Sequence, residues 1–161
     1  MSDQPAEGQL THHAMLVIWG HFARQIGLVS GLDEVVLSQK TYHHRPHTKV
    51  LEFLVAMLGG LAHLKDVRHA AHPIDQDSAV AEAWQQGAWA DASGVSRTLQ
   101  ALTMDEAGRI GAVLERVSQP FIEREVLLAV RTQGRVIYDA DLTGRPVSNS
   151  STSYPDVAYG P

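Results

Sequence analysis

The sequence predicts a mainly α-helical protein whose last residues begin a β-sheet. From residue 10 to residue 133, apolar residues recur every three or four positions, which is the spacing of amphipathic helices. From residue 135 the pattern changes to an alternation with period two, which is typical of a strand. With 161 residues, 44% of them hydrophobic, the chain is long enough for one domain with a core.

The first part of the chain is predicted to be a tail followed by two helices. Residues 1–9 are polar and are expected to be disordered. A helix is expected over residues 10–28, with Gly27 near its end. A short helix around residues 32–36 should then lead into a polar loop.

A long apolar helix is expected to form the buried centre of the helical region. Pro46 suits its first turn, and its apolar residues continue to Leu64. Gly59 and Gly60 lie within it and would weaken it by about 1 kcal/mol each relative to Ala. They are interpreted as a kink or a close helix crossing.

Further helices are predicted between residue 75 and residue 133. One covers residues 75–86, and a second begins at Ser93, which can act as its N-cap. Thr103 and Glu106 have the spacing of a capping box, so a third begins there. Pro120 is expected to start a fourth helix, which Gly134 closes. A strand should follow over residues 135–142.

The charge of the chain is uneven. The net charge is −5, but residues 40–72 contain five Lys or Arg, two acidic residues and six His, and are locally basic. An overall acidic chain gives no argument from charge for nucleic acid, so DNA binding has to rest on other features. Cysteine is absent, which excludes disulfide frameworks, thiolate metal sites and cysteine nucleophiles.

The expected location is the cytoplasm, without a membrane partner. The N-terminus lacks the basic and then apolar pattern of a signal peptide. The longest apolar run, residues 51–64, is too short to span a bilayer and contains Glu52 and His63.

Residues 77–103 fit a helix-turn-helix, with two short helices joined by a tight polar connector. The second helix would expose Ser96, Arg97 and Gln100, whose side chains can bond phosphates or base edges of DNA. Ser93, at the start of this helix, is counted with them as a candidate DNA-binding residue. The alternative is an ordinary helical hairpin with a solvated face, which is the commoner arrangement.

The histidines are a second set of candidates. His43, His44 and His47 lie in one loop, and three more histidines follow the long apolar helix. Histidine clusters can bind zinc, but this spacing matches no established ligand pattern. Histidines at the surface or at the edge of the core are the favoured interpretation.

Asp139 and Asp141 are the candidate catalytic and metal-binding residues. At positions i and i+2 of a strand they share a face, so both carboxylates can approach one hard cation such as Mg²⁺. Such a pair suits phosphoryl transfer. The alternative is a strand end at which Asp opens the turn before Gly144.

The run VIYDADLTGRPV, residues 136–147, resembles the first catalytic strand of bacterial insertion-sequence transposases of the DDE class. The resemblance implies an RNase H-like domain beginning at residue 134, with three acidic ligands for two Mg²⁺ ions. Asp141 matches the first of these ligands, and Asp139 is the second choice. The helical region also resembles the family in its apolar helix VLEFLVAMLGGLAHL and in the later Ser-Arg-x-Leu, so the resemblance covers roughly residues 45–160.

The second Asp and the Glu of the family pattern are not found. From residue 135 onward the acidic residues are Asp139, Asp141 and Asp156, and Asp156 lies too close to be the second ligand. The chain is therefore expected to be an N-terminal part of a transposase that binds element-end DNA and is inactive alone. Its partners would be duplex DNA and a full-length transposase or a complementary C-terminal chain. The alternative is a non-enzymatic helical module that binds DNA or regulates a full-length transposase.

Overall fold

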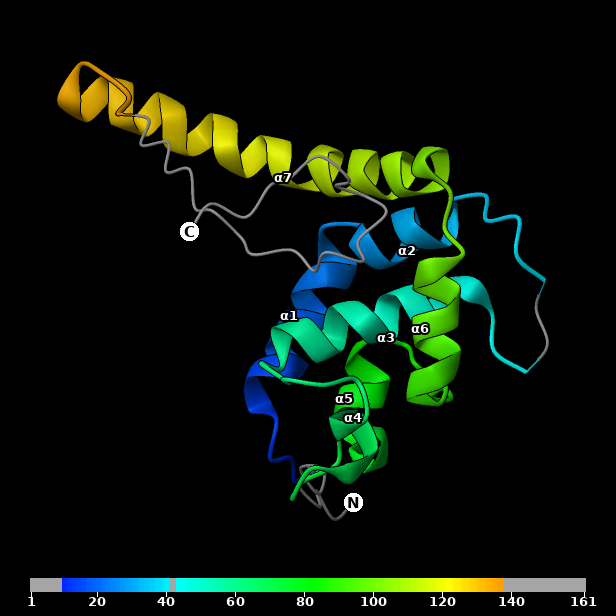
Figure 1. Ribbon diagram of the computed structural model, residues 1–161. Helices are drawn as coiled ribbons and strands as arrows, with labels where there is room; N and C mark the ends of the chain where they lie inside the picture. The colour runs from blue at the N-terminus through cyan, green and yellow to red at the C-terminus, as the bar shows by residue number, and fades with distance from the viewer. Residues whose placement is uncertain (1–9, 41–42, 138–161) are drawn as a thin grey trace, which may run out of the picture. The chain divides into compact units, whose positions relative to one another are not determined.

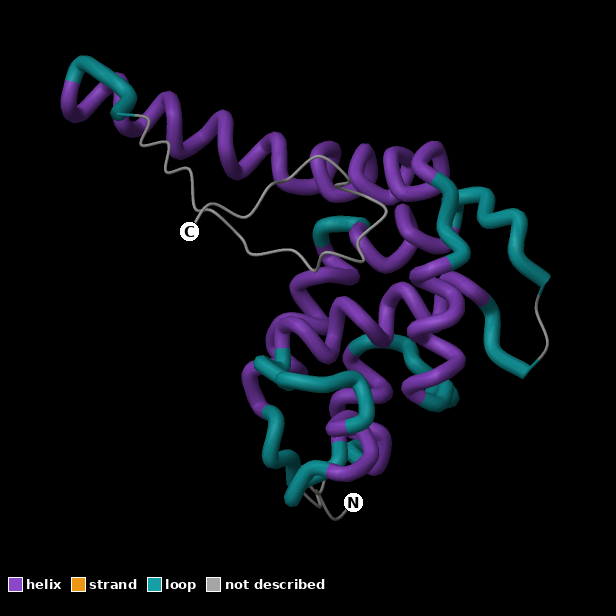
Figure 2. Tube along the Cα trace, in the orientation of Figure 1, coloured by secondary structure: helices purple, strands orange, loops and turns teal. Residues whose placement is uncertain are grey.

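The computed structural model describes residues 10–40 and 43–137, and within these ranges the chain is helical and contains no strand (Figure 2). The mainly α-helical prediction is confirmed. The elements are α1 (Ala14–Gln25), α2 (Leu28–Asp33), α3 (Pro46–Leu58), α4 (Asp66–His69), the 3₁₀ turn η1 (Ile74–Gln76), α5 (Ser78–Ala83), α6 (Ala92–Gln100) and α7 (Met104–Gln133). The chain divides into two compact units, residues 1–122 and 123–161.

The core of the first unit is built around the packing of α1 on α5 (Figure 1). Trp84 is fully buried at the end of α5, and its indole N–H donates to the Leu16 carbonyl of α1 at 2.8 Å. Gly20 allows the two helices to approach closely, because a Cβ there would lie 2.8 Å from the Cβ of Ala83. This contact joins residues more than sixty positions apart into one core.

Helix α3 crosses the middle of the unit and packs against both α2 and α6 (Figure 1). Pro46 occupies its first turn, as predicted. The helix buries Val50, Leu51 and Val55, but it leaves Met57 52% exposed. It is therefore central, with one solvent-facing side, rather than buried on every side.

The predicted extension of α3 to Leu64 is wrong, because the helix ends at Leu58. Gly60 has a φ of +68°, and its amide donates to the Met57 carbonyl. The amide of the next residue, Leu61, donates back to the Ala56 carbonyl. These bonds are those of a Schellman cap, so the glycine pair ends the helix instead of kinking it.

Only residues 78–83 of the predicted helix 75–86 form an α-helix. Asp77 caps its start by accepting bonds from the amides of Ala79 and Val80. Gln85, with a φ of +54°, takes the left-handed position at its end, and the Gln86 amide donates to the Ala81 carbonyl. The helix thus ends at Ala83, three residues before the predicted end, and glutamine takes the position after it where glycine is usual.

Helix α7 combines the two helices predicted between residues 103 and 133. The predicted restart at Pro120 is wrong, because the helix continues through this residue. The capping box is confirmed, since the Thr103 hydroxyl accepts from the Glu106 amide at 3.2 Å and the Glu106 carboxylate accepts from the Thr103 amide at 2.8 Å. Gly134, with a φ of +68°, follows its end as predicted.

Two predicted segments fall largely outside the described residues. They are the tail at 1–9 and the domain proposed to begin at residue 134. Residues 135–137, the described start of the predicted strand, are not in a strand. In the described part of the chain, no helix combines the length and apolar character needed to cross a membrane.

Candidate nucleic-acid interface

The N-terminus of α6 is fixed by Asp91 rather than by Ser93, the predicted cap. The Asp91 carboxylate accepts from the Gly94 amide and from the Ser93 hydroxyl, both at 2.6 Å. These two bonds, that from Ser93 first, lower the pKa of Asp91 below its ordinary value of 3.8. The cap therefore remains a carboxylate acceptor, and Ser93 donates its hydroxyl to it.

Helix α6 has one buried side and one exposed side. Val95 and Thr98 are buried on the side that packs against α3. Ser93, Arg97 and Gln100, spaced four and three residues apart, lie on the exposed side. Ser96, beside them, is half-buried. The four residues predicted to contact DNA therefore share one side of a helix.

The connector from α5 to α6, residues 84–91, is not the polar turn that the helix-turn-helix interpretation assumed. Trp84 and Trp89 are both buried in it. The two helices also pack on different partners, α5 on α1 and α6 on α3. The connector is therefore a packed part of the core that determines where α6 begins.

Glu52 of α3 holds the end of this connector. Its carboxylate accepts from the Ala90 amide at 2.8 Å, one residue before the α6 cap. Burial raises the pKa of Glu52 to about 7, against the lowering effect of this hydrogen bond and of Arg68. The Arg68 guanidinium donates to the Trp89 carbonyl at 2.7 Å. The Glu52 and Arg68 side chains together fix the backbone just before α6.

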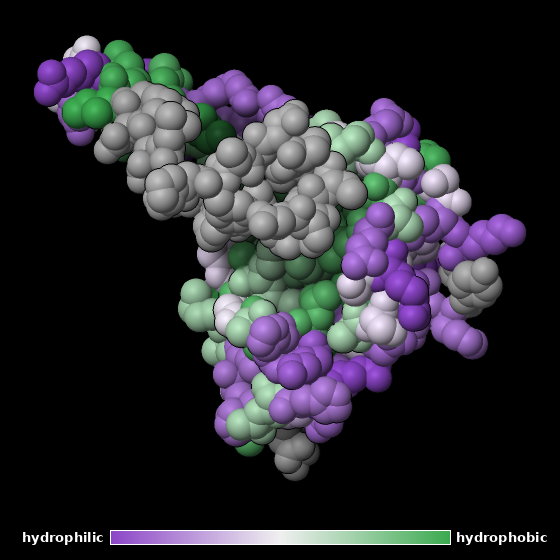
Figure 3. Space-filling view, viewed as in Figure 1, coloured by the Kyte–Doolittle hydropathy of each residue, from purple (hydrophilic) through white to green (hydrophobic). Residues whose placement is uncertain are grey.

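A surface groove of about 590 Å³ lies beside the start of α6. Its charged and titratable lining residues are Lys40, His43, His44, Lys49, Asp91 and Arg97. Figure 3 shows hydrophilic side chains gathered at the right of the view, over the loop that leads into α3. Three permanent cations therefore face one carboxylate, in a chain whose net charge is −5.

The structure brings together only some of the other predicted site residues. Asp139 and Asp141 lie outside the described residues. His43 and His44 line the groove, whereas His47 bonds the Val35 carbonyl through its Nε2 atom. Within residues 10–40 and 43–137, no group of three or more His, Asp or Glu side chains is placed to hold a metal ion.

No protein-family model, curated protein or solved structure matches this chain. Sequence reasoning selected Arg97 but not Lys40, Lys49 or Asp91. The local basic excess of residues 40–72 was the available signal for the two lysines, since both lie in that segment. The charge distribution along the sequence did not predict that Lys40 and Lys49 would line a groove together with residues of α6.

Proposed function

We propose that this chain binds duplex DNA through the exposed side of α6, as the helical N-terminal region of a DDE-class transposase. The observation that carries the proposal is the common exposed side of Arg97 and Gln100 on a helix whose other side is fixed against α3. Arginine and glutamine bond phosphates and base edges, and the major groove of DNA is wide enough to admit a helix.

The catalytic part of the proposal rests on the sequence resemblance. Asp141, with Asp139 as second choice, would be the first acidic ligand for Mg²⁺. In a complete enzyme Mg²⁺ supplies activation of water and then of a DNA 3′-hydroxyl for attack on phosphodiesters. The 161-residue chain alone is expected not to nick supercoiled DNA in Mg²⁺, since two carboxylates cannot hold two metal ions. Mg²⁺-dependent nicking that is lost in Asp141→Asn would contradict this expectation.

DNA binding is tested by fluorescence anisotropy with a labelled duplex at low salt. We expect the wild-type chain to bind and Arg97→Ala to weaken binding several-fold, because one charge-assisted contact is lost. Arg24→Ala is the matched control, since Arg24 is an exposed arginine on α1, away from the groove. Equal affinities for the wild type and both variants would show that α6 is not the contact.

A second candidate function is association with a chain that carries the same helix, namely a second copy of this chain or a full-length transposase. It is favoured by four apolar side chains of α7 that are 40–56% exposed: Val126, Leu127, Leu128 and Val130. Val126 and Leu127 precede Val130 by four and three residues and so lie with it on one side of the helix, and contiguous exposed apolar patches mark interaction surfaces. Sedimentation equilibrium of the wild type and of the double variant Leu127→Ser, Leu128→Ser tests for self-association, which the double variant should abolish.

A further inference from the structure

The loop between α2 and α3 is fastened directly to α6 and to the start of α7. The Ser38 amide and hydroxyl donate to the Glu106 carboxylate at 2.6 and 2.8 Å. The side-chain amide of Gln39 donates to the Thr98 carbonyl of α6 at 3.0 Å. Lys40 follows these two anchors, so its backbone is held beside α6.

The far end of the same loop is fastened as well. His47 bonds the Val35 carbonyl through its Nε2 atom, which joins the first turn of α3 to the residues after α2. Arg45 forms an ion pair with Asp33 at 2.9 Å. Lys49 lies one turn of α3 beyond Arg45 and lines the same groove as Lys40.

The three groove cations form no ion pair within the described chain, unlike three other arginines. Arg45, Arg68 and Arg109 each form an ion pair with an aspartate. Among the described residues, no carboxylate lies within ion-pair distance of Lys40, Lys49 or Arg97. The one carboxylate of the groove, Asp91, already accepts bonds from Ser93 and Gly94. Asp91 also interacts electrostatically with Arg97, so three cations share one carboxylate and the described lining of the groove keeps a net positive charge.

We infer that this groove is a phosphate-binding site in which Lys40, Lys49 and Arg97 hold the backbone of duplex DNA. The inference rests on the proposed function and deepens it, because it assigns the backbone contacts to Lys40 of the loop before α3, to Lys49 of α3 and to Arg97 of α6. Lysine binds phosphate as a compact charge, and arginine adds directed N–H donors. Such contacts position a protein on DNA without reading its sequence, which leaves base contacts to Gln100.

Lysine footprinting tests this assignment directly, because Lys65 is the remaining lysine of the chain and lies outside the groove. The wild-type chain is labelled with an amine-reactive ester, alone, with a 20-base-pair duplex of arbitrary sequence, and with inorganic pyrophosphate. Mass spectrometry then reports the labelling of each lysine. We expect the duplex to protect Lys40 and Lys49 several-fold and to leave Lys65 unchanged.

The possible outcomes test the groove assignment and the proposed function separately. Binding of the duplex with no protection of Lys40 and Lys49 would overturn the groove and leave DNA binding intact. Absence of duplex binding would overturn the proposed function. Protection by pyrophosphate but not by the duplex would assign the groove to a free phosphate compound, which also overturns DNA as its ligand.

A charge-removal variant provides the second readout. Lys40→Gln with Lys49→Gln should weaken duplex binding about tenfold at low salt and by the same factor for unrelated sequences, because phosphate contacts carry no sequence information. Lys65→Gln is the matched control and should bind as the wild type does. If the double variant binds the duplex as tightly as Lys65→Gln does, the assignment of Lys40 and Lys49 to the DNA backbone is wrong.

Discussion

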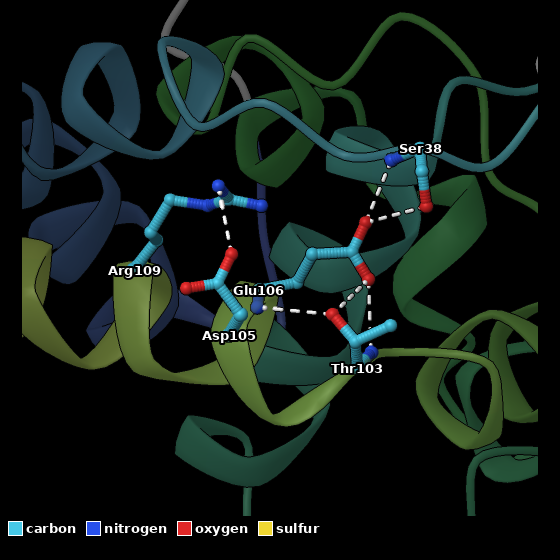
Figure 4. Close-up of polar contacts among 5 residues, drawn as sticks. All are labelled: Ser38, Thr103, Asp105, Glu106 and Arg109. Carbon is cyan, nitrogen blue, oxygen red and sulfur yellow. Dashed lines mark hydrogen bonds and ion pairs between the residues drawn. The ribbon is translucent and has the colours of Figure 1, made fainter.

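Glu106, in the first turn of α7, accepts hydrogen bonds from both the amide and the hydroxyl of Ser38, which lies 68 residues earlier in the chain (Figure 4). The second carboxylate oxygen of Glu106 accepts from the Thr103 amide and hydroxyl at 2.8 and 3.0 Å. One carboxylate therefore caps α7 and fastens the loop that carries Lys40. The side chain is 1% exposed, so water cannot replace these partners.

Replacing Glu106 with Gln should destabilise the fold and loosen the loop before α3. An amide cannot accept all four bonds, and its NH₂ group would face the donors of Ser38 and Thr103. Asp105→Asn is the matched control, because its ion pair with Arg109 is exposed and contributes at most about 0.5 kcal/mol. Urea denaturation should separate the two variants clearly, and equal unfolding free energies would refute this role.

The hydrogen bonds of the Glu106 carboxylate should also make the stability of the fold depend on pH in the acid range. Hydrogen bonds from Ser38, and then from Thr103, lower the pKa of Glu106 to about 2, from its ordinary value of 4.5. Because the folded pKa is the lower one, this stabilisation is complete above pH 4.5 and is lost as the pH falls toward 2. The wild type should therefore lose more stability than Glu106→Gln across this window in acid-unfolding experiments.

Glu52 should have the opposite pH dependence. Burial raises its pKa from 4.5 to about 7, so its contribution is complete below pH 4.5 and is lost as the pH rises through 7. Glu52→Gln should avoid this loss and be more stable than the wild type at pH 8.5, by on the order of 2 kcal/mol. Chemical denaturation at pH 5 and pH 8.5 measures the difference. Glu82→Gln, at an exposed site, controls for histidine titration and should show no such gain.

Gly20→Ala should destabilise the core where α1 meets α5. The added Cβ would lie 2.8 Å from the Ala83 Cβ and 2.9 Å from the Ala83 carbonyl carbon, so the helices must separate. Overpacking of this kind costs about 1–3 kcal/mol. Gly111→Ala is the control, because its Cβ would enter open space on α7, and it should stabilise by up to about 1 kcal/mol. If Gly20→Ala leaves the free energy of unfolding unchanged, the close approach of α1 and α5 is not required for stability.

Glycine should be the favoured residue at both helix ends, so adding it at one end and removing it at the other should shift stability in opposite directions. Gln85 holds a φ of +54°, so Gln85→Gly should stabilise by about 1 kcal/mol. Gly60 has a φ of +68° and open space around it, so Gly60→Ala should cost about 1 kcal/mol through the backbone alone. Thermal unfolding of both variants tests the pair, and a shift of the same sign in both would contradict the cap assignment.

The parts of the fold that depend on neighbouring residues could be predicted from the sequence. Pro46 at a helix start, the Thr103–Glu106 capping box and Gly134 after a helix end are local signals, and each is confirmed. The exposed side of α6 also followed from helical periodicity. These predictions succeeded because the deciding contacts lie within one or two turns of chain.

The parts that depend on distant residues could not be predicted in this way. Gln85 adopts the left-handed backbone conformation that is usual for glycine, and no local sequence pattern predicts this. The glycine pair was interpreted as a kink or a close helix crossing, and its role as the cap of α3 was not predicted. Lys40 reaches α6 only because Ser38 and Gln39 bond residues about sixty positions later. Such long-range anchors follow from the tertiary fold, which periodicity does not specify.

The salt dependence of duplex binding tests the central claim most directly. If Lys40, Lys49 and Arg97 each neutralise one phosphate, the slope of log K against log salt should be about −2.7, since each contact contributes about −0.9. The double variant Lys40→Gln, Lys49→Gln should reduce the slope to about −0.9. Absence of binding by the wild type at low salt, or a slope that the double variant leaves unchanged, would contradict the account.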